Sequence, residues 1–230
     1  MLEEFKRQVC EANLRLVREG LVFRTWGNAS GIDRERGLVV IKPSGVQYEG
    51  MGPEQMVVVR LADGETVEGD LRPSSDAPTH LELYRAFEGI GGVAHTHSLY
   101  ATAWAQARRD IPPLGTTHAD YFAGTVPCTR ELNVEEVRDE YEVNTGRVIV
   151  ERMAGLDPLA MQAVLVAGHG PFAWGPDAAT AVESAAMLEQ VARLASETLR
   201  VEPYPRPISR ALLDRHFGRK HGPGAYYGQK

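Results

Sequence analysis

Two histidines separated by one residue, at the end of an apolar run, constrain this chain more than any other feature. The run GGVA leads into His95-Thr96-His97, and a later run, VLVA, leads into Gly168-His169-Gly170. On a β-strand, residues two apart project from the same face, so the imidazoles of His95 and His97 would face one side. The spacing therefore predicts that both rings reach one shared ligand.

A lone His-x-His pair is more often a pair of surface or hydrogen-bonded core histidines than a metal site. The third histidine changes this balance, because the glycines on either side of it permit close backbone approach. Three neutral imidazoles with an open position are a ligand set of catalytic divalent-metal sites. We therefore interpret His95, His97 and His169 as ligands of one divalent metal ion.

Length and composition limit the class of protein. The 230 residues, 43% of them hydrophobic, predict a single domain over 1–230 with a sizeable core. The net charge of −6 argues against non-specific nucleic-acid binding, which needs a basic field. We find no signal peptide and no run near the ~20 apolar residues that span a membrane. With only two cysteines, the sequence predicts a soluble cytoplasmic protein without membrane contact.

Hydrophobic periodicity predicts helices and strands that alternate irregularly. Apolar residues at helical spacing predict helices over 5–20, 78–87, 99–107, 177–199 and 212–220. Short β-rich runs predict strands over 21–23, 38–41, 56–61, 92–96, 148–150 and 163–166. Residues 116–120 are predicted to form a polar loop. The helix of 177–199 is expected to serve as core scaffolding or in subunit packing.

Three short loops are rich in neutral hydrogen-bond donors. They have the sequences GNAS (27–30), KPSG (42–45) and PSSD (73–76). Neutral donors and backbone N–H groups bind anions without a basic patch, so the three loops are compatible with one phosphate site in an acidic protein. Each loop taken alone is typical of an ordinary turn, because Gly, Ser, Asn and Pro favour turns for conformational reasons.

Several further polar residues have more than one interpretation. Asp76 stands before a predicted helix. It is the N-cap of that helix or a fourth metal ligand, or it takes both roles in different states. Asp120 lies in a polar loop, where a carboxylate is usually a solvated turn former. Tyr227 is close to the C-terminus, which suggests a tail held against a core groove or a neighbouring subunit's active site. His216 and His221 lie among basic residues, and we assign them no metal role.

Seven motifs follow one another along the chain. They are TWGN (25–28), IKPSG (41–45), PSSD (73–76), HTH (95–97), GTTHADY (115–121), GHGPFAWG (168–175) and AYYGQ (225–229). Their order and spacing resemble the L-ribulose-5-phosphate 4-epimerase family of the class II aldolase and epimerase superfamily. The resemblance implies an α/β fold, a single-domain three-layer α/β/α with a central, mainly antiparallel sheet. It also implies cyclic homotetramers with active sites at subunit interfaces.

The resemblance also assigns roles to individual residues. The residues that match the metal site are Asp76, His95, His97 and His169, with zinc as the usual ion and manganese or cobalt as substitutes. The residues that match the substrate and phosphate site are Gly27, Asn28, Lys42, Ser44, Gly45, Ser74 and Ser75. Asp120 and Tyr227 match the paired acid/base residues. Class II aldolases such as L-fuculose-phosphate aldolase carry Glu where this chain has Asp76, which favours an epimerase.

The implied reaction is epimerisation of L-ribulose 5-phosphate at C4, giving D-xylulose 5-phosphate by retro-aldol cleavage, rotation of the aldehyde and re-addition. The first alternative is an aldolase that releases both fragments, against which Asp76 and the motif around Asp120 argue. The second alternative is a non-catalytic metal-binding homologue. The presence of the three histidines, Asp120 and Tyr227 argues against it.

Overall fold

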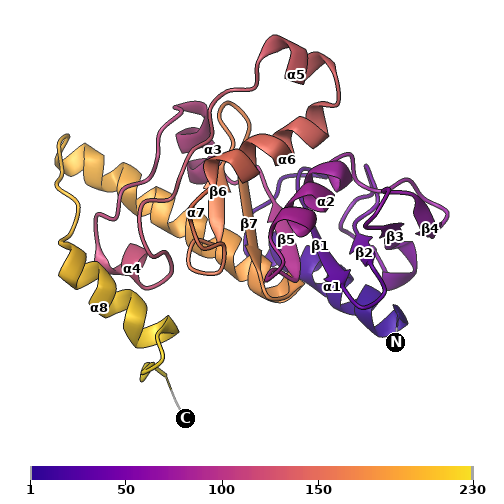
Figure 1. Ribbon diagram of the computed structural model, residues 1–230, viewed down its shortest axis with the longest axis horizontal. Coiled ribbons are helices and arrows are strands. Elements are labelled where there is room, and N and C mark those ends of the chain that lie inside the picture. The colour runs from indigo at the N-terminus through magenta and orange to yellow at the C-terminus, as the bar shows by residue number, and fades with distance from the viewer. Residues whose placement is uncertain (1, 229–230) are drawn as a thin grey trace.

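A single seven-stranded sheet organises the protein, whose computed structural model describes residues 2–228 (Figure 1). The strand order is β4-β3-β2-β1-β5-β7-β6, and all the neighbouring pairs are antiparallel. The strands are β1 (Asn28–Asp33), β2 (Leu38–Ile41), β3 (Val57–Arg60), β4 (Thr66–Glu68), β5 (Gly92–His95), β6 (Ala163–Leu165) and β7 (Pro171–Gly175). The helices are α1 (Leu2–Arg18), α2 (Ala77–Ala86), α3 (Leu99–Gln106), α4 (Thr116–Ala119), α5 (Val134–Arg138), α6 (Tyr141–Arg152), α7 (Ala178–Val201) and α8 (Arg210–His221), with a short 3-10 helix at Pro53–Gln55.

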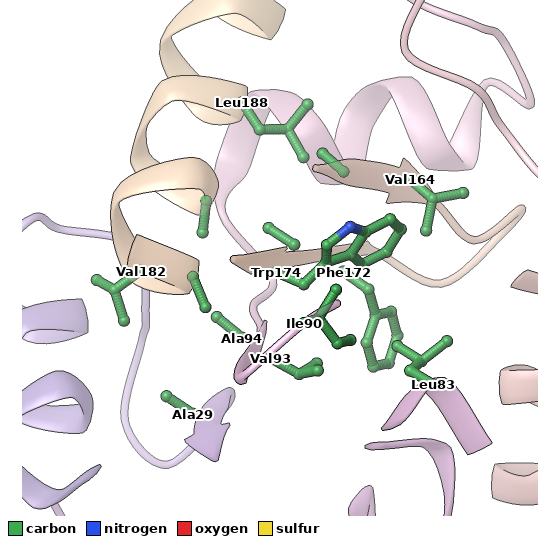
Figure 2. Packing of buried hydrophobic residues seen from close by; sticks show 14 of the residues in the cluster. Ala29, Leu83, Ile90, Val93, Ala94, Val164, Phe172, Trp174, Val182 and Leu188 are labelled. Atoms are coloured by element: carbon green, nitrogen blue, oxygen red, sulfur yellow. The ribbon is translucent and has the colours of Figure 1, made fainter. Parts of the chain in front are cut away.

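One face of the sheet is lined by small residues and covered by α1 and α7. A Cβ atom on Gly31 of β1 would lie only 2.9 Å from the ring of Phe5 in α1. A Cβ on Gly175 of β7 would lie 2.7 Å from Thr180 in α7. Figure 2 shows Val182 of α7 close to the strands in the same core. Small side chains therefore let both helices approach the strands closely.

The opposite face carries larger and more polar residues and is covered by α2. The hydroxyl of Ser30 in β1 bonds His80 Nδ1 at 2.7 Å and the Tyr84 hydroxyl at 2.8 Å, both from α2. Helix α6 packs in turn on α2, since a Cβ on Gly146 would lie 2.5 Å from Cβ of Glu82. The order α1 and α7, then sheet, then α2 and α6 confirms the predicted three-layer architecture with its mainly antiparallel sheet.

Most predicted elements are confirmed within a few residues, but four predictions are wrong. The predicted loop of 27–30 enters strand β1 at Asn28. Residues 21–23 form no strand, because α1 ends at Arg18 and the irregular segment that follows leaves Phe23 63% exposed. Val148–Val150 lies within α6, where the buried residues recur at helical spacing against α2. The predicted loop of 116–120 begins as the single-turn helix α4. No helix among residues 2–228 is long and apolar enough to cross a membrane.

Candidate active site

His95, His97 and His169, which we call the histidine cluster, come together where β5 ends and the β6–β7 loop turns. Candidate ligand atoms of the three residues all lie within 4.8 Å of one another. Their ring centroids are separated by 4.8 to 5.1 Å. His95 is buried, His169 is half-buried and His97 is exposed. The cluster therefore offers three nitrogen ligands and an open side toward solvent.

The rings are oriented by atoms outside the cluster. His95 Nδ1 lies 3.0 Å from the carbonyl oxygen of Pro171 and donates to it, so Nε2 carries the lone pair. The His95 ring also stacks on Phe172, with centroids 4.2 Å apart. His95 Nε2 then faces His97 Nε2 at 3.1 Å. Two imidazole nitrogens facing one another at this distance suit a shared cation, as a metal site requires.

Desolvation keeps the imidazoles of His97 and His169 neutral, because protein atoms surround both rings even though part of the His97 side chain is exposed. It lowers the pKa of His97 to about 4 and that of His169 to about 3, and positive charge on the neighbouring histidines lowers both pKa values further. Neutral imidazole is the form that binds a metal ion. At neutral pH both residues are therefore ready to act as ligands without first losing a proton.

Asp76 lies beside the histidine cluster but is not one of the residues within 4.8 Å of one another. It occupies the N-cap position of α2, as the sequence predicts, yet its side chain makes no capping hydrogen bond. Instead, Asp76 Oδ2 accepts a hydrogen bond of 2.7 Å from Asn28 Nδ2. Asp76 is thus the N-cap residue of α2 without a capping side-chain hydrogen bond, and its role as a metal ligand stays a prediction.

A cavity of about 540 Å³ opens over the histidine cluster. Its lining includes all the residues predicted to bind metal, substrate or phosphate: Gly27, Asn28, Lys42, Ser44, Gly45, Ser74, Ser75, Asp76, His95, His97 and His169. It also includes Trp26, Tyr141 and Glu142, to which the sequence analysis gave no role. Tyr141 and Glu142 stand in a charged segment without motif or periodicity, so no sequence signal could have identified them.

The three donor-rich segments each contribute residues to the lining of this cavity, although residues 28–30 of the first belong to strand β1 and not to a loop. The Ser44 N–H donates to the Arg72 carbonyl at 3.0 Å, and the Ser74 N–H donates to the Lys42 carbonyl at 3.0 Å. Asn28 Nδ2 reaches Ser74 Oγ at 3.1 Å, which links the first loop to the third. The structure therefore brings the loops together, while their binding of phosphate stays a prediction.

Lys42 supports these loops from within the protein. Its buried Nζ donates to the Val46 carbonyl at 2.6 Å and to the Pro43 carbonyl at 3.3 Å, and lies 4.8 Å from the Tyr48 ring centroid. The Tyr48 hydroxyl donates in turn to the Gly27 carbonyl at 2.7 Å. Burial lowers the pKa of Lys42 to about 8. Lys42 thus places a titratable cation in the wall of the cavity.

Asp120 and Tyr227 lie outside the cavity of the histidine cluster. Asp120 closes α4 and accepts from His216 at 2.9 Å and Arg219 at 2.8 Å, with Lys220 at 3.6 Å. We call these four residues the Asp120 cluster. Burial raises the pKa of Asp120, but the hydrogen bonds from Arg219 and His216 and the nearby positive charges outweigh it and lower the pKa.

Tyr227 belongs to the same region and is 62% exposed. Its ring centroid lies 5.0 Å from the Arg219 guanidinium carbon and 4.6 Å from Lys220 Nζ. In Figure 1, α4 and α8 lie at the end of the molecule opposite β3 and β4. Within residues 2–228, neither Asp120 nor Tyr227 lines the cavity of the histidine cluster. Gln229, the last residue of the C-terminal motif, lies outside the described residues.

Comparison with known proteins agrees with this architecture. The profile of the Class II Aldolase and Adducin N-terminal domain family matches residues 7–196. The L-ribulose-5-phosphate 4-epimerase UlaF of Salmonella paratyphi B is 58% identical over 229 residues, which cover 100% of each chain.

Solved structures show the same fold. An L-fuculose 1-phosphate aldolase superposes with a TM-score of 0.80 at 25% identity, over 94% of this chain and 95% of that one. The L-fuculose-1-phosphate aldolase of Thermus thermophilus gives a TM-score of 0.69 at 25% identity, over 89% and 100%. With a profile match over most of its length and a full-length relative of high identity, the chain belongs to the class II aldolase and adducin N-terminal domain family.

Proposed function

We propose that the protein is a metal-dependent epimerase that interconverts L-ribulose 5-phosphate and D-xylulose 5-phosphate by inversion at C4. The observation that carries this proposal is the 58% identity, over both full chains, to an L-ribulose-5-phosphate 4-epimerase. We treat 1–230 as one domain with one active site. A cytoplasmic location is part of the proposal, and it is supported by two cysteines that are both free.

The cofactor of this proposal is a divalent metal ion, with Zn²⁺ first and Mn²⁺ or Co²⁺ as alternatives. Three imidazoles with an open side suit Zn²⁺, and Asp76 adds a carboxylate nearby. When bound, the ion supplies Lewis acidity that stabilises negative charge on the oxygens of the cleaved sugar. His95, His97 and His169 would hold it at the floor of the cavity.

The position of C4 dictates the reaction path. Its hydrogen is one bond too far from the C2 carbonyl to be acidic, so proton exchange at C4 cannot invert the centre. A base therefore takes the proton of the C4 hydroxyl, and the C3–C4 bond breaks. Its electron pair passes to the C1–C3 fragment as an enediolate, and C4 becomes the aldehyde of glycolaldehyde phosphate. After rotation of the aldehyde, the C3–C4 bond reforms on its other face and an acid protonates the new alkoxide.

Separate groups of residues in the chain would bind the phosphate and transfer the protons. Ser44, Ser74 and Ser75 with Asn28 would hold the phosphate, so that the aldehyde fragment rotates without escaping. Inversion requires one acid/base group on each side of the aldehyde, and we assign these roles to Asp120 and Tyr227.

Asp120 and Tyr227 lie outside the cavity of their own chain. This position agrees with the resemblance, from which we propose a homotetramer in which a neighbouring subunit completes each site.

The decisive experiment incubates the protein with L-ribulose 5-phosphate and either Zn²⁺ or Mn²⁺, then identifies the sugars by NMR. We expect D-xylulose 5-phosphate, with no accumulation of free dihydroxyacetone and glycolaldehyde phosphate. Steady release of the two fragments would instead support the aldolase, the second candidate, which the structural similarity to L-fuculose 1-phosphate aldolase favours. Metal binding without turnover of the sugar would support a non-catalytic homologue.

A further inference from the structure

The rings of the histidine cluster differ in how their outer sides are held. His95 is fixed by a strand carbonyl and by stacking on Phe172. His169 lies in the β6–β7 loop after Gly168, whose positive φ of 73° marks a sharp turn. Across the described chain, the His169 ring has one hydrogen bond, between Nδ1 and the Tyr141 hydroxyl at 3.3 Å. The orientation of His169 therefore depends on Tyr141.

Tyr141 is itself held in place at the first turn of α6. Thr145 Oγ1 donates to the Tyr141 carbonyl at 2.9 Å. Thr79 Oγ1, from α2, donates to the carbonyl of the next residue, Glu142, at 2.5 Å. Glu140, which precedes the helix, adopts a left-handed conformation with φ of 53°. The start of α6 is thus tied to α2, which keeps the tyrosine over the cavity.

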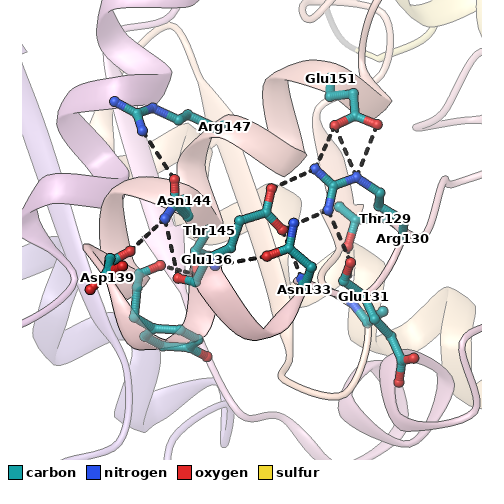
Figure 3. A network of polar contacts seen from close by, with 12 residues as sticks. Thr129, Arg130, Glu131, Asn133, Glu136, Asp139, Asn144, Thr145, Arg147 and Glu151 are labelled. Carbon is teal, nitrogen blue, oxygen red and sulfur yellow. Dashed lines mark hydrogen bonds and ion pairs between the residues drawn. The ribbon is translucent and has the colours of Figure 1, made fainter.

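A polar network braces the junction between α5 and α6 (Figure 3). Asn144 Nδ2 donates to the Asp139 carbonyl at 2.6 Å and to the Glu136 carbonyl at 3.1 Å. The Arg130 guanidinium binds Glu136 at 2.7 Å and Glu151 at 2.9 Å. These contacts leave the turn before Tyr141 little freedom.

We propose that Tyr141 is a positioning residue for the metal, in that its hydroxyl accepts a hydrogen bond from His169 Nδ1 and directs Nε2 of His169 into the histidine cluster. The inference rests on the proposed metal site. A partner on the outer nitrogen fixes both the tautomer and the rotation of a ligating imidazole. Because a tyrosine hydroxyl both accepts and donates, its own proton stays free to point into the cavity that Tyr141 lines.

The test replaces Tyr141 with Phe, which keeps the ring and removes the hydroxyl. We would measure Zn²⁺ affinity by chelator competition and the visible absorption spectrum of the Co²⁺-substituted protein. We expect affinity to fall by about 10- to 100-fold, as for other outer partners of metal ligands, with a changed cobalt spectrum. The matched control is Tyr100→Phe in α3, because the Tyr100 hydroxyl has no hydrogen-bond partner among residues 2–228.

A second variant, Asn144→Ala, loosens the brace while leaving the hydroxyl in place, and we expect a smaller loss of affinity. If Tyr141→Phe and Asn144→Ala both keep the wild-type Zn²⁺ affinity and cobalt spectrum, the proposal is overturned. It is also overturned if Tyr100→Phe loses as much Zn²⁺ affinity as Tyr141→Phe. A wild-type protein that binds no Zn²⁺ or Co²⁺ would overturn the metal site itself. The two failures are therefore distinguishable.

Discussion

The histidine cluster and the Asp120 cluster are built in opposite ways. The first lies at the end of a central strand, where desolvation keeps the imidazoles of His97 and His169 neutral, a backbone carbonyl orients His95 and the Tyr141 hydroxyl contacts His169. The second lies on the periphery, where a carboxylate is bound by three basic side chains of α8. Helix α8 buries only Leu213 among its side chains, so charge rather than apolar packing fixes much of its position.

The difference teaches that the fold of one chain completes only half of the proposed site. The sheet positions the metal half, because His95 ends β5, His97 follows it by two residues, and His169 lies in the loop between β6 and β7. The acid/base half depends on a short charged helix that does not reach the cavity of its own chain. Changes in the first half should affect metal binding, and changes in the second half should affect catalysis without affecting metal binding.

The largest effect is expected from His97→Asn, which removes a ligand and should abolish both metal retention and activity. The loss of metal affinity should exceed the 10- to 100-fold typical of outer partners. Because His97 is exposed, circular dichroism should show an intact fold. Full metal content by atomic emission would contradict its assignment as a ligand.

Tyr227→Phe is the complementary change in the second half. It should lower kcat for epimerisation by roughly 10²- to 10⁴-fold, the usual contribution of an acid/base group, and leave metal content unchanged. Tyr226→Phe, at the exposed neighbouring position, is the control.

Mixing Tyr227→Phe with His97→Asn subunits sharpens the comparison. Hybrid oligomers should regain activity in sites that combine an intact metal half with an intact tyrosine. Subunit exchange proven by native mass spectrometry, without any recovery, would rule out sites shared between subunits.

Ser75→Ala should weaken binding of the substrate phosphate. Loss of one neutral hydrogen bond to a charged phosphate costs about 1.5 to 3 kcal/mol, so KM should rise by roughly 10- to 150-fold while metal affinity stays the same. Steady-state kinetics with L-ribulose 5-phosphate would measure this effect. An unchanged KM would remove Ser75 from the phosphate site.

The smallest effect concerns pH. Lys42 has its pKa lowered to about 8 by burial, so its ammonium is charged below that pH and becomes neutral above it. One pH unit above the pKa the charged fraction falls to about one tenth, and KM for the phosphorylated substrate should rise over the same interval. In Lys42→Met we expect a KM that is higher than that of the wild-type protein and does not change with pH across this interval. A pH-dependent rise that persists in Lys42→Met would assign it to another group.

The sequence could predict the histidine cluster from the His-x-His spacing and the glycine-flanked third histidine, but strand alternation is not what places the rings, since β5 ends at His95 and His97 follows it. It could not predict β1 as a strand, since the Asn-Ala-Ser-Gly segment has low β-propensity and resembles a turn. Val148–Val150 shows the reverse error, because β-branched residues suit a strand and yet pack here in a helix on α2. Tyr141 meets His169 only through tertiary packing, which no local pattern encodes.

The alternation of residues along β1 also has a practical consequence for handling the protein. Asn28 and Ser30 point toward α2 and the cavity side, whereas Ala29 and Gly31 point toward α1. A slip of one residue against β5 would bury the polar pair beneath α1 and remove Asn28 from beside Asp76. Misregistered chains would therefore lose the core and the site together. The metal content of a preparation should thus serve as an assay of how many of its molecules are correctly folded.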